Sequence, residues 1–260
     1  MPAVADQVEP RAGEDGFAGV LVRMGVLLDS LPPERASWRA FLATYLRTTT
    51  AVGKAVAGAA FEDPDWVERW DVVFAGLYLD AVDAALSAGP VPRPWRLAFD
   101  ADPSLPDLRR LLLGINAHVN YDLPQALLEV ISDDDFADPV LMDRRRRDHE
   151  RIDAVLVSRV SAEDDLLGPG TLLDRVLTPL NRTGSRRFLR EARHKVWHNT
   201  YELQAARVEG RAPYDERLAE LEVLAAAKIA DLLQPGQVIL RLAVAGFGVT
   251  LPPRRTTSRT

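Results

Sequence analysis

The chain has four histidines, and each lies four residues from another potential proton carrier or metal ligand. The pairs are His118/Asp122, His149/Asp153 and His194/His198. Residues four apart on a helix share a face, so each pair can act as a unit. A carboxylate beside an imidazole orients the ring and stabilises its cation, which suits acid–base catalysis. The same two groups are also typical ligands of Zn or Fe.

The first pair lies within the strongly apolar stretch 108–127, in the string Asn-Ala-His-Val-Asn-Tyr-Asp. With about 100° of rotation per residue in a helix, His118 and Asp122 border the apolar stripe and face the core or a cavity. Burying polar groups is costly unless they are paired. The sequence therefore predicts either a catalytic or ligand-binding cluster or a buried pair that links two helices. We take His118 and Asp122 as candidate catalytic residues.

A second polar pair lies on the helix expected after Pro139. Asp148 and His149 both fall on the apolar face of this helix, and we take them as further candidate catalytic residues. The neighbouring arginines, residues 144–147, favour an alternative in which the pair is only salt-bridged or lies at the surface. Both interpretations remain open at this point.

The long helix expected over 185–208 carries the third histidine pair and an asparagine. Asn199 points toward the apolar stripe, whereas His194 and His198 turn away from it. Residues 191–194, Glu-Ala-Arg-His, match the Glu-x-x-His element of di-iron bundles, but such sites need two copies and further glutamates. The pair that looks most like a metal motif is thus the one least expected to face the core.

The candidate substrate-binding residues are polar and aromatic side chains expected to border the same region. They are Asn116, Asn120, Tyr121, Asn199 and Trp95. Trp95 lies in the proline-rich connector 90–106, which we expect to pack over the body of the protein as a lid-like loop. Polar groups that converge from several helices on an apolar pocket are the usual components of a small-molecule site.

A bound metal is the less favoured form of this site. The chain has no cysteine, which excludes thiolate ligands and thiol catalysis. If a metal binds, its ligands would be His118, Asp122 and His149, and Zn or Fe would suit them. We favour no cofactor, with Zn or Fe as the alternative.

The elements that must position these residues are helices separated by proline and glycine. Apolar residues recur at helical spacing, and no alternation is sustained enough for a sheet. We predict an all-α protein, with one bundle-like domain of about seven to nine helices over 17–250. A disordered leader (1–16) precedes it and a disordered tail (251–260) follows. Pro124 should kink or restart the helix that carries His118, because proline removes a backbone donor.

Composition and charge exclude several classes of protein. The 260 residues carry a formal net charge of −6, which argues against nucleic-acid binding, since that usually requires a basic face. No apolar run approaches the roughly eighteen residues of a membrane span, and the N-terminus lacks a signal-peptide pattern. We therefore expect a cytoplasmic protein whose partner is a small-molecule substrate. The oligomeric state does not follow from the sequence.

Three stretches carry most of the polar motifs: residues 111–124 with the string Asn-Ala-His-Val-Asn-Tyr-Asp-Leu, residues 146–153 and residues 192–199. Together they resemble an actinobacterial family of domains of unknown function, over roughly residues 17–245. The resemblance implies an all-α fold. A much weaker likeness is to zinc-dependent phospholipase C and related nucleases, which carry His-x-x-x-Asp on a core helix. This chain lacks their further histidines at matching positions.

Two classes of function fit these observations. The first is a small-molecule enzyme with an apolar pocket between helices, in which His118 and Asp122 perform acid–base chemistry. Cyclisation, isomerisation, dehydration or hydrolysis in specialised metabolism would suit such a site. A variant of this class is a Zn- or Fe-dependent hydrolase or oxygenase. The second class is a non-catalytic helical binding or scaffold domain, whose polar cluster fixes the register of the helices.

Overall fold

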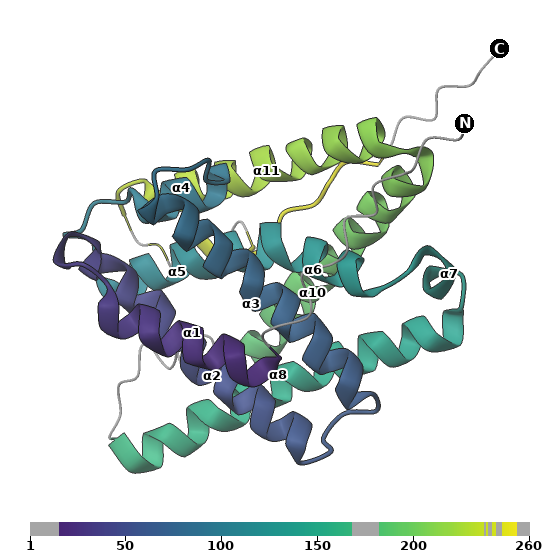
Figure 1. The fold of residues 1–260 in the computed structure, drawn as a ribbon, viewed down its shortest axis with the longest axis horizontal. Helices are drawn as coiled ribbons and strands as arrows, with labels where there is room; N and C mark the ends of the chain where they lie inside the picture. Colours follow the sequence, from purple (N-terminus) through teal and green to yellow (C-terminus); the bar gives the residue numbers. More distant parts are fainter. Residues whose placement is uncertain (1–15, 168–181, 237, 239–240, 243–245, 254–260) are drawn as a thin grey trace, which may run out of the picture.

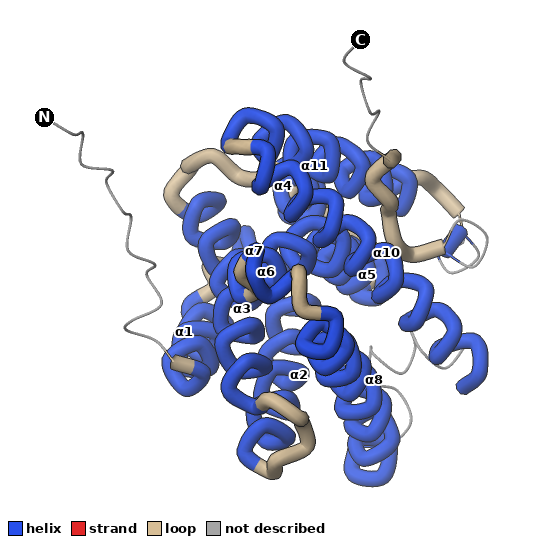
Figure 2. The backbone as a smooth tube through the Cα atoms, turned by 90° about the vertical axis from the view of Figure 1, so that its right-hand side faces the viewer, coloured by secondary structure: helices blue, strands red, loops and turns tan. Residues whose placement is uncertain are grey.

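All the regular secondary structure in the described part of the chain is helical. The computed structural model describes residues 16–167, 182–236, 238, 241–242 and 246–253 (Figure 1). Within these ranges there is no β-strand, and Figure 2 shows helices joined by loops. The prediction of an all-α protein is therefore confirmed.

Three helices form the N-terminal part of the fold. They are α1 (Phe17–Ser30), α2 (Arg39–Ala57), which follows the 3-10 helix η1 (Pro33–Trp38), and α3 (Pro64–Leu86). Pro64 suits the first turn of α3, where a missing backbone N–H costs nothing. Asp63 caps this helix, because its carboxylate accepts a hydrogen bond from the Trp66 amide at 3.1 Å.

The middle of the chain forms a run of shorter elements. They are α4 (Arg93–Phe99), α5 (Asp107–Ala117), the π-helical turn η2 (His118–Asp122), α6 (Leu123–Val130) and α7 (Asp133–Phe136). The interruption expected near Pro124 takes the form of the π turn between α5 and α6. The lid-like loop expected over 90–106 is instead partly helical, since α4 lies within it and buries Trp95.

Three long helices complete the described fold: α8 (Pro139–Leu167), α10 (Arg182–Glu209) and α11 (Arg211–Leu233). Because α5, η2 and α6 continue one another and η1 leads directly into α2, the described residues form nine helical rods, within the predicted range. None of the helices in these residues is long and apolar enough to cross a membrane. The sequence also predicts a short helix near 172–177, but this segment, the leader 1–15 and the end of the tail, 254–260, lie outside the described residues.

The apolar core surrounds α3, which crosses the middle of the molecule in Figure 1 and contacts α1, α2 and α6. This helix buries an aromatic side chain at every fourth position. They are Trp66, Trp70, Phe74 and Tyr78. Full burial of a phenylalanine-sized side chain contributes roughly 1.5–3 kcal/mol. The aromatic ridge of α3 is the wall against which the candidate site is built.

A non-helical segment near the C-terminus, residues 246–253, packs against α10 and α11 (yellow in Figure 1). We call it the C-terminal strap. Its Leu251 is fully buried in a cluster with Leu203 and Leu221, and the Leu251 carbonyl oxygen lies 3.0 Å from His198 Nε2. The expected disordered tail begins at this residue, so the start of that tail is packed into the core.

Two asparagine side chains hold the strap. The Asn120 amide donates to the Phe247 carbonyl at 3.2 Å and accepts from the Val249 N–H at 3.1 Å. The Asn199 amide donates to the Val249 carbonyl at 3.0 Å and accepts from the Leu251 N–H at 2.9 Å. Each amide therefore satisfies two backbone groups of the strap, two residues apart, as a neighbouring β-strand would.

Candidate functional site

The candidate catalytic pair lies in η2, between α5 and α6. His118 and Asp122 are 3% and 1% exposed, and His118 Nδ1 lies 2.8 Å from Asp122 Oδ2. Trp95 of α4 donates its Nε1–H to the same oxygen at 2.8 Å. The pair is thus buried, as the apolar stripe predicts, and a third side chain from a separate helix joins it.

Pro124 explains why the helix widens here. A proline has no N–H for the carbonyl four residues earlier, and its ring clashes with that carbonyl, which belongs to Asn120. The π turn over η2 relieves the clash, and the helix restarts at Leu123 with Pro124 in its first turn. Single π turns within helices frequently occur at functional sites.

Five aromatic rings surround His118, and we call them the aromatic cage. They are Phe41, Tyr45, Phe74, Tyr78 and Trp95, from α2, α3 and α4. Phe74 stacks on the imidazole, with ring centroids 3.6 Å apart and an interplanar angle of 6°. Gly114 of α5 makes room for the cage, because a Cβ there would lie 2.5 Å from the Phe41 ring.

The cage favours the neutral forms of both members of the pair. Burial lowers the pKa of His118 well below its usual value. Burial also raises the pKa of Asp122 well above its usual value, although the Trp95 hydrogen bond opposes this. When the carboxyl O–H of a neutral pair donates to Nδ1, the ring hydrogen lies on Nε2. The two groups share one proton and titrate as a unit.

Two further buried titratable residues, Asp71 and Tyr45, were missed in the sequence, and the ring of Tyr45 lies 4.5 Å from that of His118. Asp71 of α3 is 5% exposed, and burial raises the pKa of its carboxyl to about 7. Burial also raises the pKa of Tyr45 well above its usual value, and the carboxyls of Asp71 and Asp122 raise it further. The sequence does contain one indication that Asp71 is buried. It lies four residues from each of two apolar residues, Val67 and Ala75, and therefore on the same face of α3, and both are buried in the structure.

We call these five side chains the buried polar cluster, in which Tyr45 lies against His118 and near enough to Asp71 for that carboxyl to raise its pKa. Its members, from α2, α3, α4 and η2, are Tyr45, Asp71, Trp95, His118 and Asp122. Three of its atoms, Tyr45 Oη, Asp71 Oδ2 and His118 Nε2, have no hydrogen-bond partner among the described residues. Buried polar atoms in folded proteins are normally paired. These three atoms therefore keep an unused capacity for hydrogen bonding.

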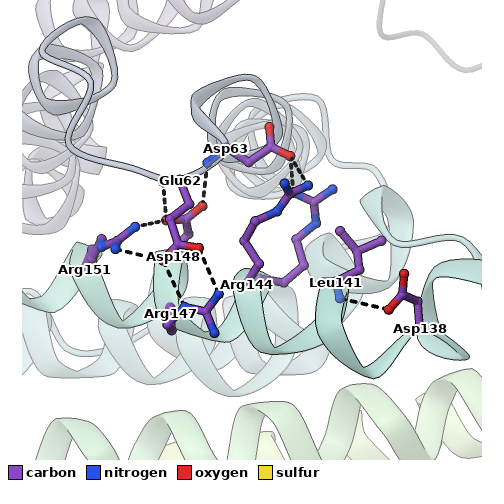
Figure 3. Close-up of polar contacts among 9 residues, drawn as sticks. Glu62, Asp63, Asp138, Leu141, Arg144, Arg147, Asp148 and Arg151 are labelled. Atoms are coloured by element: carbon purple, nitrogen blue, oxygen red, sulfur yellow. Dashed lines mark hydrogen bonds and ion pairs between the residues drawn. The ribbon is translucent and has the colours of Figure 1, made fainter.

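Asp148 belongs to a separate network, at the loop between α2 and α3 (Figure 3). Its carboxylate accepts the backbone N–H groups of Glu62 and Asp63 at 2.7 and 2.8 Å, and it pairs with Arg151 at 2.8 Å. These charge-assisted hydrogen bonds offset the cost of burying the carboxylate. The structure therefore does not bring Asp148 to His118. The prediction that both residues belong to one catalytic site is wrong for Asp148.

The arginine run 144–147 explains most of this network. Two of its side chains form ion pairs with Asp63 and one with Glu62. These three are Arg144, Arg145 and Arg147. Arg146 turns instead toward α10, where it donates a hydrogen bond to the Tyr201 hydroxyl at 2.9 Å. Of the two interpretations of this stretch, the structure favours the salt-bridged one for Asp148.

His149 is separated from His118 by two aromatic rings. It packs between Trp70 and Trp197, with ring centroids 5.3 and 5.7 Å away. Trp70 stacks on Phe74 at 5.9 Å, and Phe74 in turn covers His118. Burial lowers the pKa of His149 to about 3, so it is a neutral core residue at physiological pH.

The three residues suggested as metal ligands do not come together. His118 and Asp122 are bonded to each other, whereas His149 lies beyond Phe74 and Trp70. Among the described residues, no group of three His, Asp or Glu side chains could hold a metal ion. A site built from these three ligands therefore does not fit, and the expectation that no metal binds stays a prediction.

The candidate substrate-binding residues divide between the cluster and the strap. Trp95 belongs to the buried polar cluster. Asn120 and Asn199 hold the strap, and Asn116 accepts a further hydrogen bond from the Asn120 amide at 3.1 Å. Tyr121 packs into the apolar cluster that also contains Leu251. The amides therefore have a structural role, and a part in substrate binding stays a prediction for them and for Tyr121.

The helices and the cluster define an all-α protein with a buried imidazole–carboxylate pair inside an aromatic cage. A model of the family of unknown function DUF5995 matches residues 17–235. The chain therefore belongs to this family, which confirms the expected membership of a family of unknown function. No curated protein and no solved structure gave a match.

Proposed function

We propose that this protein is a cytoplasmic enzyme that transfers protons on a small molecule bound at the buried polar cluster. The observation that carries the proposal is a buried imidazole–carboxylate pair inside an aromatic cage, one of whose members, Tyr45, also lies near a second buried carboxyl group, that of Asp71. Perturbed titratable groups that meet in an apolar site are typical of acid–base enzymes. Cyclisation, isomerisation, dehydration and hydrolysis are the reactions that such groups support.

The His118–Asp122 pair exchanges one proton with the substrate through Nε2. In the neutral pair, His118 gives its Nε2 proton to the substrate while the carboxyl proton of Asp122 moves to Nδ1. The ring stays neutral and Asp122 becomes a carboxylate. In that second state Nε2 has a free lone pair and takes a proton, with the carboxylate orienting the ring. The pair can therefore act as acid and as base in one cycle.

The other two groups complete the site. The carboxyl of Asp71 has a pKa of about 7, so both of its forms are accessible near neutral pH and it can supply or remove a second proton. The hydroxyl of Tyr45 stays protonated because its pKa is raised, and it donates a hydrogen bond to a developing negative charge. A substrate that gains and loses protons at two positions would use all four groups.

Substrate access requires part of the aromatic cage to open, because His118 is almost fully buried. The cage is formed by three helices, of which α4, with 7 residues, is the shortest. Its Trp95 bonds directly to Asp122. We assign α4 the role of a lid, whose opening breaks this bond and uncovers the imidazole. Lids of this kind commonly gate the reaction on the microsecond to millisecond timescale.

One observation favours a non-catalytic role instead, namely the close stacking of Phe74 on His118 at 3.6 Å. In that case the pair links η2 to α3 and α4 and fixes the register of the helices. The two functions differ in the effect of a substitution that conserves shape. A structural staple would lose stability alone, whereas an enzyme would lose its activity with the fold intact.

Asp122→Asn tests the proposal. The amide keeps the shape of the carboxyl group, and its oxygen, placed where Asp122 Oδ2 lies, can accept both the Trp95 N–H and a His118 Nδ1–H. The variant should therefore fold, but it cannot exchange a proton with the ring. We expect the rate to fall by about 10²–10⁴-fold. The measurement incubates each protein with a cell extract and follows the consumption of small molecules by mass spectrometry.

Asp143→Asn is the matched control, because this aspartate is exposed on α8. It should keep both the rate and the melting temperature of the wild type. Full activity in a folded Asp122→Asn variant would overturn the proposal. So would a wild type that consumes no compound while Asp122→Asn melts far below the control, since that combination indicates a staple.

A further inference from the structure

A surface hollow between α8 and α10 has no part in the proposed reaction. Its volume is about 390 Å³. The lining residues recur at helical spacing on one face of each helix. They include Arg146 and Glu150 of α8 and Arg190, Arg193, Trp197 and Tyr201 of α10. We call this hollow the arginine groove. It shares no residue with the buried polar cluster, so the two proposals can fail independently.

The groove carries an excess of positive charge. Among its described lining residues, three arginines stand against one carboxylate, that of Glu150. This carboxylate lies 3.6 Å from Arg193, and its side chain is 60% exposed; Asp143, which is not part of the lining, lies 3.5 Å from Arg146. Arg190 is exposed and forms no ion pair with another described residue. Such a cluster on a chain with net charge −6 indicates an anionic ligand.

Arg193 is the most enclosed of the three arginines. Its side chain is 10% exposed, and burial lowers the pKa of its guanidinium group. Charges interact more strongly in such a partly desolvated position than in bulk water. The groove is therefore lined by one enclosed and one exposed arginine of α10.

Arg146 is held in place against two aromatic rings. Its guanidinium carbon lies 5.9 Å from the ring centroid of Trp197 and 5.4 Å from that of Tyr201, and the group donates to the Tyr201 hydroxyl. Trp197 is 6% exposed, and its Nε1–H has no acceptor among the described residues. The groove thus combines a fixed cation with an aromatic wall.

We propose that the arginine groove binds a phosphorylated small molecule that carries a flat ring. Arginine presents paired N–H donors that match the oxygens of a phosphate, and Arg146 of α8 and Arg190 of α10 supply them from the two sides of the groove. The ring packs on the side of Trp197 and Tyr201, where aromatic contacts add to affinity. A volume of about 390 Å³ is within the usual range of small-molecule pockets.

Phenyl phosphate is the probe, and calorimetric titration of the full chain is the measurement. Phenyl phosphate should bind more tightly than inorganic phosphate or phenol, because only this probe has both the anion and the ring. Arg190→Gln should weaken its binding about tenfold or more, since a charge-assisted hydrogen bond is lost. Added salt should weaken binding as well. The melting temperature should stay that of the wild type, because Arg190 is exposed.

Arg69→Gln is the control, since this arginine is exposed on α3 and does not line the groove. It should bind phenyl phosphate as the wild type does. The proposal is overturned if the wild type binds none of the probes, or if Arg190→Gln binds phenyl phosphate as tightly as Arg69→Gln. Equal affinities for inorganic phosphate and phenyl phosphate would contradict the part of the proposal that concerns the ring.

Discussion

At position 71 a carboxyl group stands where the spacing of α3 favours an apolar residue. Val67 and Ala75, one turn away on either side, are fully buried. Asp71 forms no ion pair within the described residues, and burial alone raises its pKa to about 7. The group therefore destabilises the fold once it is ionised, a feature that active sites often have at the expense of stability.

The stability of the protein should reflect this titration. An unfolded Asp71 loses its proton near pH 4, whereas the folded one keeps it up to about pH 7. Between these values the folded state holds the extra proton, so a rise in pH favours unfolding. Asp71→Asn cannot titrate. The free energy of unfolding, wild type minus variant, should therefore decrease by a few kcal/mol from about pH 4 to about pH 8 in urea denaturation.

His149 supplies the opposite trend, because its pKa is lowered to about 3 and its contribution to stability is lost as the pH falls. It is present in both proteins and cancels in the difference. If the difference in the free energy of unfolding between the wild type and Asp71→Asn does not change with pH, the carboxyl of Asp71 is not buried as described. If this difference increases with pH, the carboxyl of Asp71 has a cationic partner.

The sequence predicts His118 and Asp122 because two polar residues four apart interrupt a long apolar stripe. It does not single out Asp71 in the same way, since one carboxyl group on an amphipathic helix is usually exposed. Tyr45 fits an ordinary apolar spacing, and only the fold places its hydroxyl near two carboxyls. Single polar residues are thus recognised as members of a site only when their neighbours in space are known.

At the scale of elements, proline and apolar spacing carry most of the predictable information. Pro64 and Pro139 begin α3 and α8, and Pro124 accompanies the π turn. The connector 90–106 is different, because its prolines favour a loop. It contains α4, whose stability comes from burial of Trp95 against the core, and local sequence does not reveal such tertiary packing.

The strap could not be predicted either, because its hydrogen bonds join residues far apart in the sequence. Asn199→Ala tests its contribution. The substitution leaves the Val249 carbonyl and the Leu251 N–H without their partner. Leaving such buried groups unsatisfied costs about 1–3 kcal/mol. We expect a loss of that size in the free energy of unfolding, measured by urea denaturation.

Gln204→Ala, five residues further along α10, is the control, since this side chain makes only a surface hydrogen bond to Asp133. Its effect should stay within about 0.5 kcal/mol. Asn199→Ala and Gln204→Ala of equal stability would show that the strap does not depend on the asparagine amide.

Over the whole molecule, the residues that helical spacing gathers into one pocket separate into distinct regions. His118 and Asp122 lie in the cage, Asp148 in the loop network of Figure 3, and Asn199 at the strap. The spacing of polar residues predicts correctly which of them are buried. It does not predict which helices face one another, since that depends on the packing of the aromatic ridge of α3.

The central claim is that the cage opens locally to admit a substrate to His118, and diethyl pyrocarbonate labelling tests it most directly. This reagent acylates neutral imidazole nitrogen, and peptide mass spectrometry resolves the four histidines. The exposed His194 is the internal reference. Local opening should label His118 slowly, at a rate almost independent of urea below the unfolding transition. A labelling rate that instead rises with urea in parallel with global unfolding would contradict the claim and make the pair a structural staple.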